Sequence, residues 1–354
     1  MKLKKLELVG FRNHKHKEIK FGQLTIIVGE NAKGKTNILE AIYLLSTGDS
    51  FRAGKIEEMI NWEQDLARVE GYVEDDEGND LVLGITLTKG LLMGKRTPKR
   101  KYFVDRVAKQ KRKFVGKLLA VVFRPEDLRL IEGSPGRRRK FLDEVLGMVS
   151  WEYKRALTLY ENALRRRNKI LDLIREGRAR REELVFWDMT LIKNGNILTN
   201  WRREFLEFLS DLEVGFGKYK VEYDFSAVSE SRLEQYEREE VLAGYTLVGP
   251  HKDDFVISSP FTVHRSQWKN LHIYGSRGEQ RLGVLFLKYG SLKFVEEKLG
   301  VVPMFLLDDI FSELDEKHRQ MVLEMMKNRQ TVITSADEYV LDDLRERAVG
   351  VVRV

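Results

Sequence analysis

The stretch "GENAKGKT" (29–36) constrains the fold of this 354-residue chain more than any other part of its sequence. It fits the pattern G-x-x-x-x-G-K-[ST], whose glycines let backbone N–H groups turn inward around phosphate groups. Such a loop follows a buried strand and opens a helix. The apolar, β-branched run "LTIIVG" (24–29) supplies the strand, and apolar residues at helical spacing continue to residue 45. The sequence therefore predicts a nucleotide-phosphate loop in an α/β fold.

The residues of this loop have separate expected roles. Lys35 is expected to reach the β- and γ-phosphates and to assist catalysis, and the Thr36 hydroxyl is expected to ligate Mg²⁺. The loop backbone and the start of the helix would hold the phosphates. The expected nucleotide-binding residues are Gly29, Glu30, Asn31, Ala32, Lys33, Gly34, Lys35, Thr36 and Asn37.

A second apolar run, "MFLLDD" (304–309), ends in two carboxylates. A carboxylate at the end of a buried strand beside the loop can hold Mg²⁺ through water. We expect Asp308 to be this metal ligand, together with Thr36, and Asp309 to be the catalytic residue that orients or deprotonates the attacking water. One Asp after an apolar strand is explained as a turn residue, but two in a row downstream of a phosphate loop favour a nucleotide site.

The middle of the chain differs from its two ends. Alternating residues 2–9 predict an exposed or edge strand, and "LLAVVF" (118–123) predicts a buried one. On both sides of "EGRARREE" (176–183), apolar residues recur every three or four positions, which predicts two heptad helices in an antiparallel hairpin. This spacing leaves open whether the hairpin projects or packs on its own domain. Strand-like runs return at "KYKVEYDF" (218–225), "YTLVG" (245–249), "DFVIS" (254–258), "VVPMFLLDD" (301–309) and "QTVITSA" (330–336).

Two polar stretches carry a resemblance to a known family. "FLLDDIFSELD" (305–315) resembles the joined Walker B and D-loop of ABC-type ATPases, with Ser312 and Asp315 in the D-loop. "GSRGEQR" (275–281) resembles the ABC signature in the form found in SMC and double-strand-break repair ATPases. Ser276, Gly278 and Glu279 match that signature, whereas an arginine and a glycine replace two of its usual residues. The resemblance implies an ABC-type P-loop ATPase head over residues 1–125 plus 241–354, with a mainly β second lobe and an inserted α-helical lid or arm subdomain over residues 126–240.

Further stretches narrow the resemblance to the RecF family of bacterial DNA-repair ATPases. They run in order along the whole chain and are "FRNH" (11–14), "GDSFR" (48–52), "VVFRPEDLRLIEGSPGRRRKFLDE" (121–144) and "TLVGPHKDDF" (246–255). This resemblance implies ATP and Mg²⁺ as cofactors, Arg12 and Asn13 near the nucleotide, and an ATP-dependent homodimer. In that dimer Ser276, Gly278 and Glu279 would meet the γ-phosphate on the other subunit. It also implies weak, DNA-stimulated hydrolysis, a role in recombinational repair, replication restart and the SOS response, and RecO and RecR as partners in loading recombinase at gaps.

Two departures from the ABC pattern bear on the expected rate of ATP hydrolysis. ABC transporters carry a His after the last strand, where this chain has Thr334 and Ser335, and Asp309 stands where Glu is usual. The side chain of Asp309 is shorter than that of Glu, which fits slow hydrolysis better than rapid turnover. The alternative functions are an ATPase subunit of a transporter or other motor, a P-loop kinase, and a DNA-binding protein with an inactive nucleotide site. The missing His and the long charged helix between the signature and "MFLLDD" disfavour the transporter.

Charge and cysteine content narrow the class of protein. The 62 basic and 55 acidic residues give a formal net charge of +7, which permits nucleic-acid binding without requiring it. The chain has no cysteine, which fits a reducing compartment, and no run approaches the ~20 apolar residues of a membrane span. We expect a cytoplasmic protein whose basic clusters contact the DNA backbone rather than its bases. The expected contacts are Lys109, Lys111, Arg137, Arg138 and Arg139.

Overall fold

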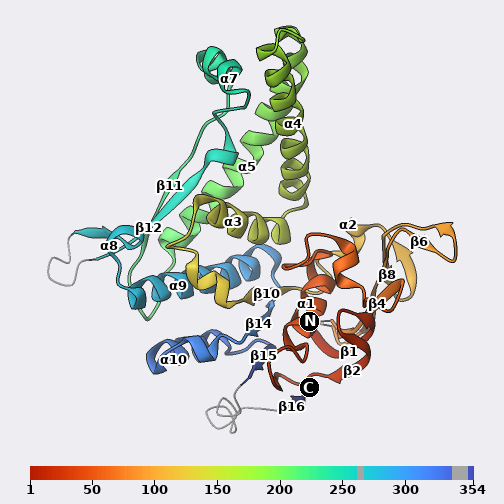
Figure 1. Cartoon of the computed structure of the whole chain (residues 1–354). Helices are drawn as coiled ribbons and strands as arrows, with labels where there is room; N and C mark the ends of the chain where they lie inside the picture. The colour runs from red at the N-terminus through yellow and green to blue at the C-terminus, as the bar shows by residue number, and fades with distance from the viewer. Residues whose placement is uncertain (76, 261–266, 337–349) are drawn as a thin grey trace. The chain divides into compact units, whose positions relative to one another are not determined.

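The computed structural model describes residues 1–75, 77–260, 267–336 and 350–354, and it divides into two compact units (Figure 1). Unit 1 comprises Met1–Asp127 and Ser291–Val354, and unit 2 comprises Leu128–Gly290. Residues 241–290 were expected to belong to the ATPase head, but they lie in unit 2. The chain returns to unit 1 only at Ser291, within a long helix. The expected domain boundaries themselves stay a prediction.

Unit 1 contains a five-stranded sheet in which every pair of neighbours is parallel. Four of its strands were predicted as apolar runs, whereas the fifth, β16, was missed. Its strands, in order across the sheet, are β10 (Ala120–Phe123), β14 (Met304–Asp308), β15 (Thr331–Ser335), β3 (Leu24–Val28) and β16 (Gly350–Arg353). Because the strands are parallel, their carboxyl ends lie along one edge, where an α/β sheet holds its ligands.

A six-stranded antiparallel sheet forms the other layer of unit 1. Its order is β2 (His14–Lys20), β1 (Lys2–Phe11), β4 (Leu66–Glu74), β5 (Asp80–Thr88), β8 (Arg100–Val104) and β9 (Val107–Lys109). The prediction that residues 2–9 form an exposed or edge strand is wrong, because β1 pairs with β2 on one side and β4 on the other. A small hairpin, β6 (Leu91–Leu92) and β7 (Lys95–Arg96), extends from β5.

Helix α1 (Lys35–Thr47) lies between the two sheets of unit 1. It contacts strands of both, and a single apolar cluster joins Leu8 of β1, Leu45 of α1 and Leu306 of β14. The sequence predicted one apolar face, but nearly the whole helix is buried, including Glu40 and Ser46. The remaining short elements of this unit are η1 (Ile56–Met59), α2 (Lys111–Phe114), η5 (Phe311–Glu313) and α10 (Glu316–Met325), and η2 (Pro125–Arg129) leads into unit 2.

Unit 2 is built around two long helices, α4 (Trp151–Arg175) and α5 (Val185–Asp211), which pack side by side (Figure 1). This pair confirms the predicted helical hairpin. Leu191, Leu198 and Phe205 are buried at seven-residue spacing, but beyond Leu198 the buried face widens to include Arg202 and Leu209. The buried positions therefore follow the 3.6-residue period of a straight helix rather than a strict heptad.

The rest of unit 2 combines short helices with a three-stranded sheet. The predicted strand at 245–249 is wrong: its backbone N–H groups donate to side chains instead, including Thr246 to Asn168 and Leu247 to Glu240. The elements are α3 (Pro135–Val149), η3 (Arg181–Leu184), β11 (Lys220–Asp224), α6 (Glu230–Gln235), α7 (Glu237–Ala243), η4 (Pro250–Lys252), β12 (Asp254–Pro260), β13 (Trp268–Asn270), α8 (Leu271–Tyr274) and α9 (Arg277–Leu299), whose last part belongs to unit 1. Among the described residues, no helix is long and apolar enough to cross a membrane.

A buried ionic cluster ties α5 to the segment before β12. Arg202 donates to Asp253 Oδ2 at 2.9 Å, to Asp143 Oδ1 at 2.9 Å and to the Pro250 carbonyl at 2.7 Å. The side chain of Asp253 has no exposed surface, and it also accepts from the Ser226 N–H at 2.7 Å. Such a cluster stabilises a fold only while every member is paired.

His251 is a second buried polar group of unit 2, and it is held in its neutral form. Its Nδ1 lies 2.7 Å from the Tyr160 hydroxyl and its Nε2 lies 3.1 Å from the Thr246 carbonyl. Since the carbonyl can only accept, Nε2 carries the proton and Nδ1 accepts from Tyr160. Burial lowers the pKa of His251 to about 4, because the charged ring would lose its solvation, and the positive charges of Lys252, Arg139 and Arg167 act in the same direction.

We predict that Arg202→Met destabilises the protein by about 3–5 kcal/mol, because it leaves the Asp253 carboxylate buried without a countercharge. The measurement is urea unfolding followed by circular dichroism. Arg203→Met is the matched control, since the neighbouring guanidinium stacks on the Phe225 ring and is only half-buried. Equal losses in the two variants would contradict the importance of the cluster.

A second prediction concerns pH. The pKa of His251 is about 4 in the folded protein against 6.5 for an ordinary imidazole, so the unfolded chain takes up the proton first as the pH falls. Stability should be full above about pH 6.5 and decline towards about pH 4, by about 3 kcal/mol in all. His251→Gln should remove the His251 share of this decline in urea unfolding across that range and leave the share that comes from the lowered pKa of His14. His16→Gln, at an exposed site, should keep the full decline. If His251→Gln retains the wild-type decline, the assignment is wrong.

Candidate nucleotide-binding site

The loop between β3 and α1 has the geometry of a phosphate cradle. Gly34 has φ 102° and Ala32 has φ 66°, so the chain turns twice through the left-handed region. A Cβ at Gly34 would lie 2.5 Å from Asn13 Oδ1, so only glycine fits there. The Lys35 ammonium folds over the loop and donates to the carbonyls of Gly29, at 2.7 Å, and Glu30, at 2.9 Å. The first N–H groups of α1 have no partner within the helix, as at any helix start.

Asp308 lies at the carboxyl end of β14 and reaches this loop although β15 separates β14 from β3. The register pairs Asp308 with Thr334, and Thr334 with Ile27 near the end of β3. The Thr36 hydroxyl donates to Asp308 Oδ1 at 2.8 Å, and the Thr334 hydroxyl lies 2.9 Å from the same oxygen. The structure thus brings together Thr36 and Asp308, which were predicted from motifs more than 250 residues apart in the sequence.

The two carboxylates after β14 differ in environment. Burial raises the pKa of Asp308, while the hydrogen bonds with Thr36 and Thr334 act in the opposite direction. Asp309 has φ 50°, and its N–H donates to the Thr334 carbonyl at 3.1 Å. The Ala336 N–H donates to Asp309 Oδ1 at 3.4 Å. The left-handed turn therefore separates a buried carboxylate, Asp308, from a more exposed one, Asp309.

Arg12 and Asn13 lie against the loop and α1. Arg12 forms a bidentate pair with the fully buried Glu40, with nitrogen–oxygen distances of 2.8 and 2.6 Å. Asn13 donates to the Lys33 carbonyl at 3.0 Å and accepts from Asn37 at 2.8 Å. Both predicted residues thus adjoin the loop, and Arg12 is oriented by a carboxylate on α1.

Sequence reasoning missed three residues that surround this cluster. Glu40 accepts from both Arg12 and the Ser50 hydroxyl, Arg52 donates to Asn37 Oδ1 at 2.9 Å, and His14 Nε2 lies 3.2 Å from the Gly34 carbonyl. Burial lowers the pKa of His14, so a neutral ring donates this bond. One signal was available in the sequence: Glu40 interrupts an otherwise apolar run at the centre of α1.

The two D-loop residues contact their own segment. The Ser312 hydroxyl donates to the Asp309 carbonyl at 2.8 Å, and Asp315 caps α10 by accepting from the His318 N–H at 3.0 Å. Ser312 therefore shapes the turn that carries Asp309, and Asp315 has a structural role within its chain.

The signature residues belong to unit 2 and form a capping box at the start of α9. The Ser276 N–H and hydroxyl donate to Glu279 Oε2 at 2.9 and 3.0 Å, and the Glu279 N–H donates to the Ser276 hydroxyl at 3.3 Å. Lys269 pairs with Glu279 at 2.5 Å. A Cβ at Gly278 would meet nothing within 4 Å, so the side of the helix start at Gly278 is open. Ser276 itself is exposed.

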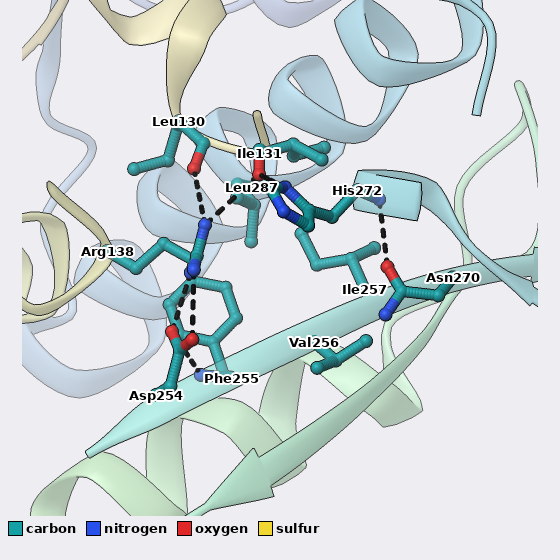
Figure 2. Close-up of a pocket in the computed structure, with 10 residues that line it drawn as sticks. All are labelled: Leu130, Ile131, Arg138, Asp254, Phe255, Val256, Ile257, Asn270, His272 and Leu287. Carbon is teal, nitrogen blue, oxygen red and sulfur yellow. Dashed lines mark hydrogen bonds and ion pairs between the residues drawn. The ribbon is translucent and has the colours of Figure 1, made fainter. Parts of the chain in front are cut away.

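The five predicted DNA-contacting residues fall into two groups. Arg138 is buried and forms a bidentate pair with Asp254, at 2.6 and 2.9 Å, and it also donates to carbonyls before α3 (Figure 2). Lys111 pairs with Asp49 at 2.6 Å, and Arg139 donates to the Asp253 carbonyl at 2.8 Å. The guanidinium of Arg138 is thus occupied within unit 2. Lys109 and Arg137 are exposed.

Residues 2–354 match the family described as RecF/RecN/SMC N terminal domain. The chain is 32% identical to the DNA replication and repair protein RecF of Bacillus subtilis, over 100% of this chain and 98% of that protein. It is 34% identical to the protein of the same name from Geobacillus kaustophilus, over 99% and 97% of the two chains.

Solved structures that resemble this chain indicate the same family as these relatives. The structure of the recombination mediator protein RecF-ATPrS in the RecFOR pathway superposes with a TM-score of 0.84 and 29% identity, covering 95% of this chain and 92% of that one. A structure of the same protein with ATP gives a TM-score of 0.81. The Smc head domain of Pyrococcus yayanosii shares the fold at 12% identity, with a TM-score of 0.53 over 99% and 94% of the two chains. With a family match across nearly every residue and relatives above 30% identity over their full length, this chain belongs to the RecF family.

Proposed function

We propose that this chain binds ATP with Mg²⁺, dimerises on DNA when ATP is bound, and hydrolyses ATP slowly to release the dimer. In this proposal it is a cytoplasmic, weak, DNA-stimulated ATPase of recombinational repair and replication restart. It acts in the SOS response and helps RecO and RecR to load recombinase at gaps. The names of its full-length relatives and the RecFOR pathway named for its structural neighbours support this assignment.

One observation carries the proposal: the Thr36 hydroxyl and Asp308 Oδ1 meet at 2.8 Å beside the phosphate loop. A hydroxyl and a carboxylate at the end of a parallel strand are the hard oxygen donors that Mg²⁺ prefers. Bound Mg²⁺ would neutralise negative charge on the β- and γ-phosphates. Its presence would also favour the ionised form of Asp308, whose pKa burial raises in the metal-free protein.

The residues in and around the loop would then have separate roles in binding and hydrolysing ATP. Lys35 Nζ would exchange its two loop carbonyls for phosphate oxygens, and the N–H groups at the start of α1 would bind the same phosphates. Arg12 and Asn13, fixed by Glu40 and Asn37, would line the nucleotide. Asp309 would orient the attacking water and accept its proton. Ser312 would fix the turn that carries Asp309.

A second subunit would complete the site. Ser276 and Gly278 stand at an exposed helix start, where backbone N–H groups and the helix dipole attract phosphate. Glu279 holds the Ser276 hydroxyl and N–H in a fixed orientation, which makes this helix start a preformed surface. We infer that it meets the γ-phosphate of the partner subunit, so that ATP joins the two heads. A transporter subunit or other motor is not favoured, because the solved structures that resemble this chain at 29% identity are of RecF-ATPrS and RecF-ATP.

We predict that Asp309→Asn retains ATP binding but lowers single-turnover hydrolysis by about 100-fold or more, because the amide cannot accept the proton of water. Binding of a fluorescent ATP analogue and phosphate release under single-turnover conditions measure the two effects separately. Glu313→Gln removes a nearby exposed carboxylate and should change neither. An Asp309→Asn protein that hydrolyses ATP at the wild-type rate would disprove the catalytic role.

We also predict an ATP-dependent dimer that Ser276→Arg abolishes while ATP binding survives, since the bulky cation would block the helix start. Light scattering after gel filtration, with and without ATP, measures the mass. Ser231→Arg, at another exposed serine of unit 2, is the control and should still dimerise. Lys35→Arg should lose the dimer too. A wild-type protein that stays monomeric with ATP and DNA would contradict the proposed function.

A further inference from the structure

The positive charge of this chain is concentrated in one short segment. Residues 89–117 hold 12 of the 62 basic residues but only one of the 55 acidic residues, Asp105. The other 325 residues therefore hold 50 basic and 54 acidic residues, and their formal net charge is −4. The excess of +7 that the whole chain carries arises entirely from this segment, which comprises β6 to β9 and α2 of unit 1.

Among the residues that the structure describes, most of these cations have no acidic partner. Lys89, Lys99, Arg100 and Lys111 pair with acidic residues from other parts of unit 1. Seven others are exposed and make no ion pair within the described part of the chain. They are Lys95, Arg96, Lys101, Arg106, Lys109, Arg112 and Lys113. Unpaired like charges on neighbouring strands repel one another, so this surface gains free energy from a polyanion.

Two tight hairpin turns in the segment carry exposed apolar side chains. Met93 and Gly94 form the two-residue turn between β6 and β7, with φ 48° and 74°, and Met93 is 96% exposed. Such a turn favours Asn, Asp or Gly at its first position, because other residues are strained in the left-handed region. A methionine here costs stability and buries nothing within its own chain. Leu91 on the same hairpin and Val107 on the next are also exposed.

We propose that the β6–β7 hairpin of residues 91–96 binds in a groove of duplex DNA, with Met93 against the bases and Lys95 and Arg96 on the flanking phosphates. A two-stranded ribbon fits the major groove of duplex DNA, where apolar side chains can contact the bases. The hairpin is a two-stranded sheet of its own that extends from the rest of its unit (Figure 1), and all of its residues except Leu92 are exposed. This assignment rests on the proposed DNA-binding function and gives that function its contact surface.

The charge pattern favours DNA over an anionic membrane. A membrane-binding element needs a continuous apolar face beside its cations, whereas this segment exposes only Leu91, Met93 and Val107 among its large apolar residues. The cations continue through β8, β9 and α2, as suits an extended line of phosphates rather than a single headgroup. A sequence-independent, backbone-directed contact follows from this arrangement.

Fluorescence anisotropy of the full chain with a labelled 30-base-pair duplex, across a series of salt concentrations, tests the proposal. Lys95→Gln/Arg96→Gln should weaken binding about tenfold near 100 mM salt and lower the salt slope by about 2, because two phosphate contacts are lost. Met93→Ser should weaken binding about threefold or more with an unchanged slope, because it removes an apolar contact and no charge. Both variants should keep ATP affinity and DNA-free hydrolysis.

Two matched controls isolate the hairpin. Lys17→Gln/Lys20→Gln removes the same charge from β2, an edge strand of the six-stranded sheet to which β6 and β7 do not belong, and Val302→Ser removes an exposed apolar side chain elsewhere in unit 1. If the hairpin and control charge variants lose affinity equally, or if neither loses it, the hairpin assignment is overturned while DNA binding by the wild type still supports the proposed function. An effect confined to vesicles of anionic lipid would also overturn it. A wild-type protein that binds no duplex, with or without ATP, would refute both proposals.

Discussion

One carboxylate oxygen, Oδ1 of Asp308, organises the candidate nucleotide site of this protein. It lies within hydrogen-bonding distance of the hydroxyls of Thr36 and Thr334, which belong to two other segments of the chain. This junction exists only because β14, β15 and β3 are in one register, which aligns their carboxyl ends. A slip of one residue would turn Asp308 to the other face of the sheet and leave a buried hydroxyl without its partner.

The sequence predicted those parts of the fold that depend on local pattern. Strands β3, β10, β14 and β15 and the helices α1, α4, α5 and α9 follow from apolar runs or helical spacing. The prediction failed where backbone groups find partners far away. Residues 245–249 are apolar enough for a strand, yet side chains of α4 and α7 satisfy their N–H groups. Strand β16 is four residues long and is defined by β3, more than 300 positions earlier.

The site shows the same division between local and distant information. Motif spacing predicted Lys35, Thr36 and Asp308 as residues of the candidate nucleotide site, and the structure brings Thr36 and Asp308 together. Each of these motifs lies within a short stretch of sequence. The sequence motifs could not distinguish basic residues that form ion pairs within the protein from those that are exposed and able to contact DNA. Arg138 and Arg137 are adjacent in a basic run, but Asp254, 116 positions away, binds only the first of them. The role of the buried Glu40 likewise becomes clear only from its ion pair with Arg12, with which it shares no sequence motif.

Strand β16 also has a consequence for the order in which the protein can assemble. It pairs with β3 along its length, and a Cβ at Gly29, the first loop residue, would lie 2.4 Å from the Val354 carbonyl. The loop strand therefore stays unpaired on that side until the ribosome has synthesised residue 353, and such distant pairings form slowly. Unit 2 is one continuous stretch, Leu128–Gly290, and can fold while synthesis continues. A nascent chain would thus display a folded helical arm well before it could hold a nucleotide.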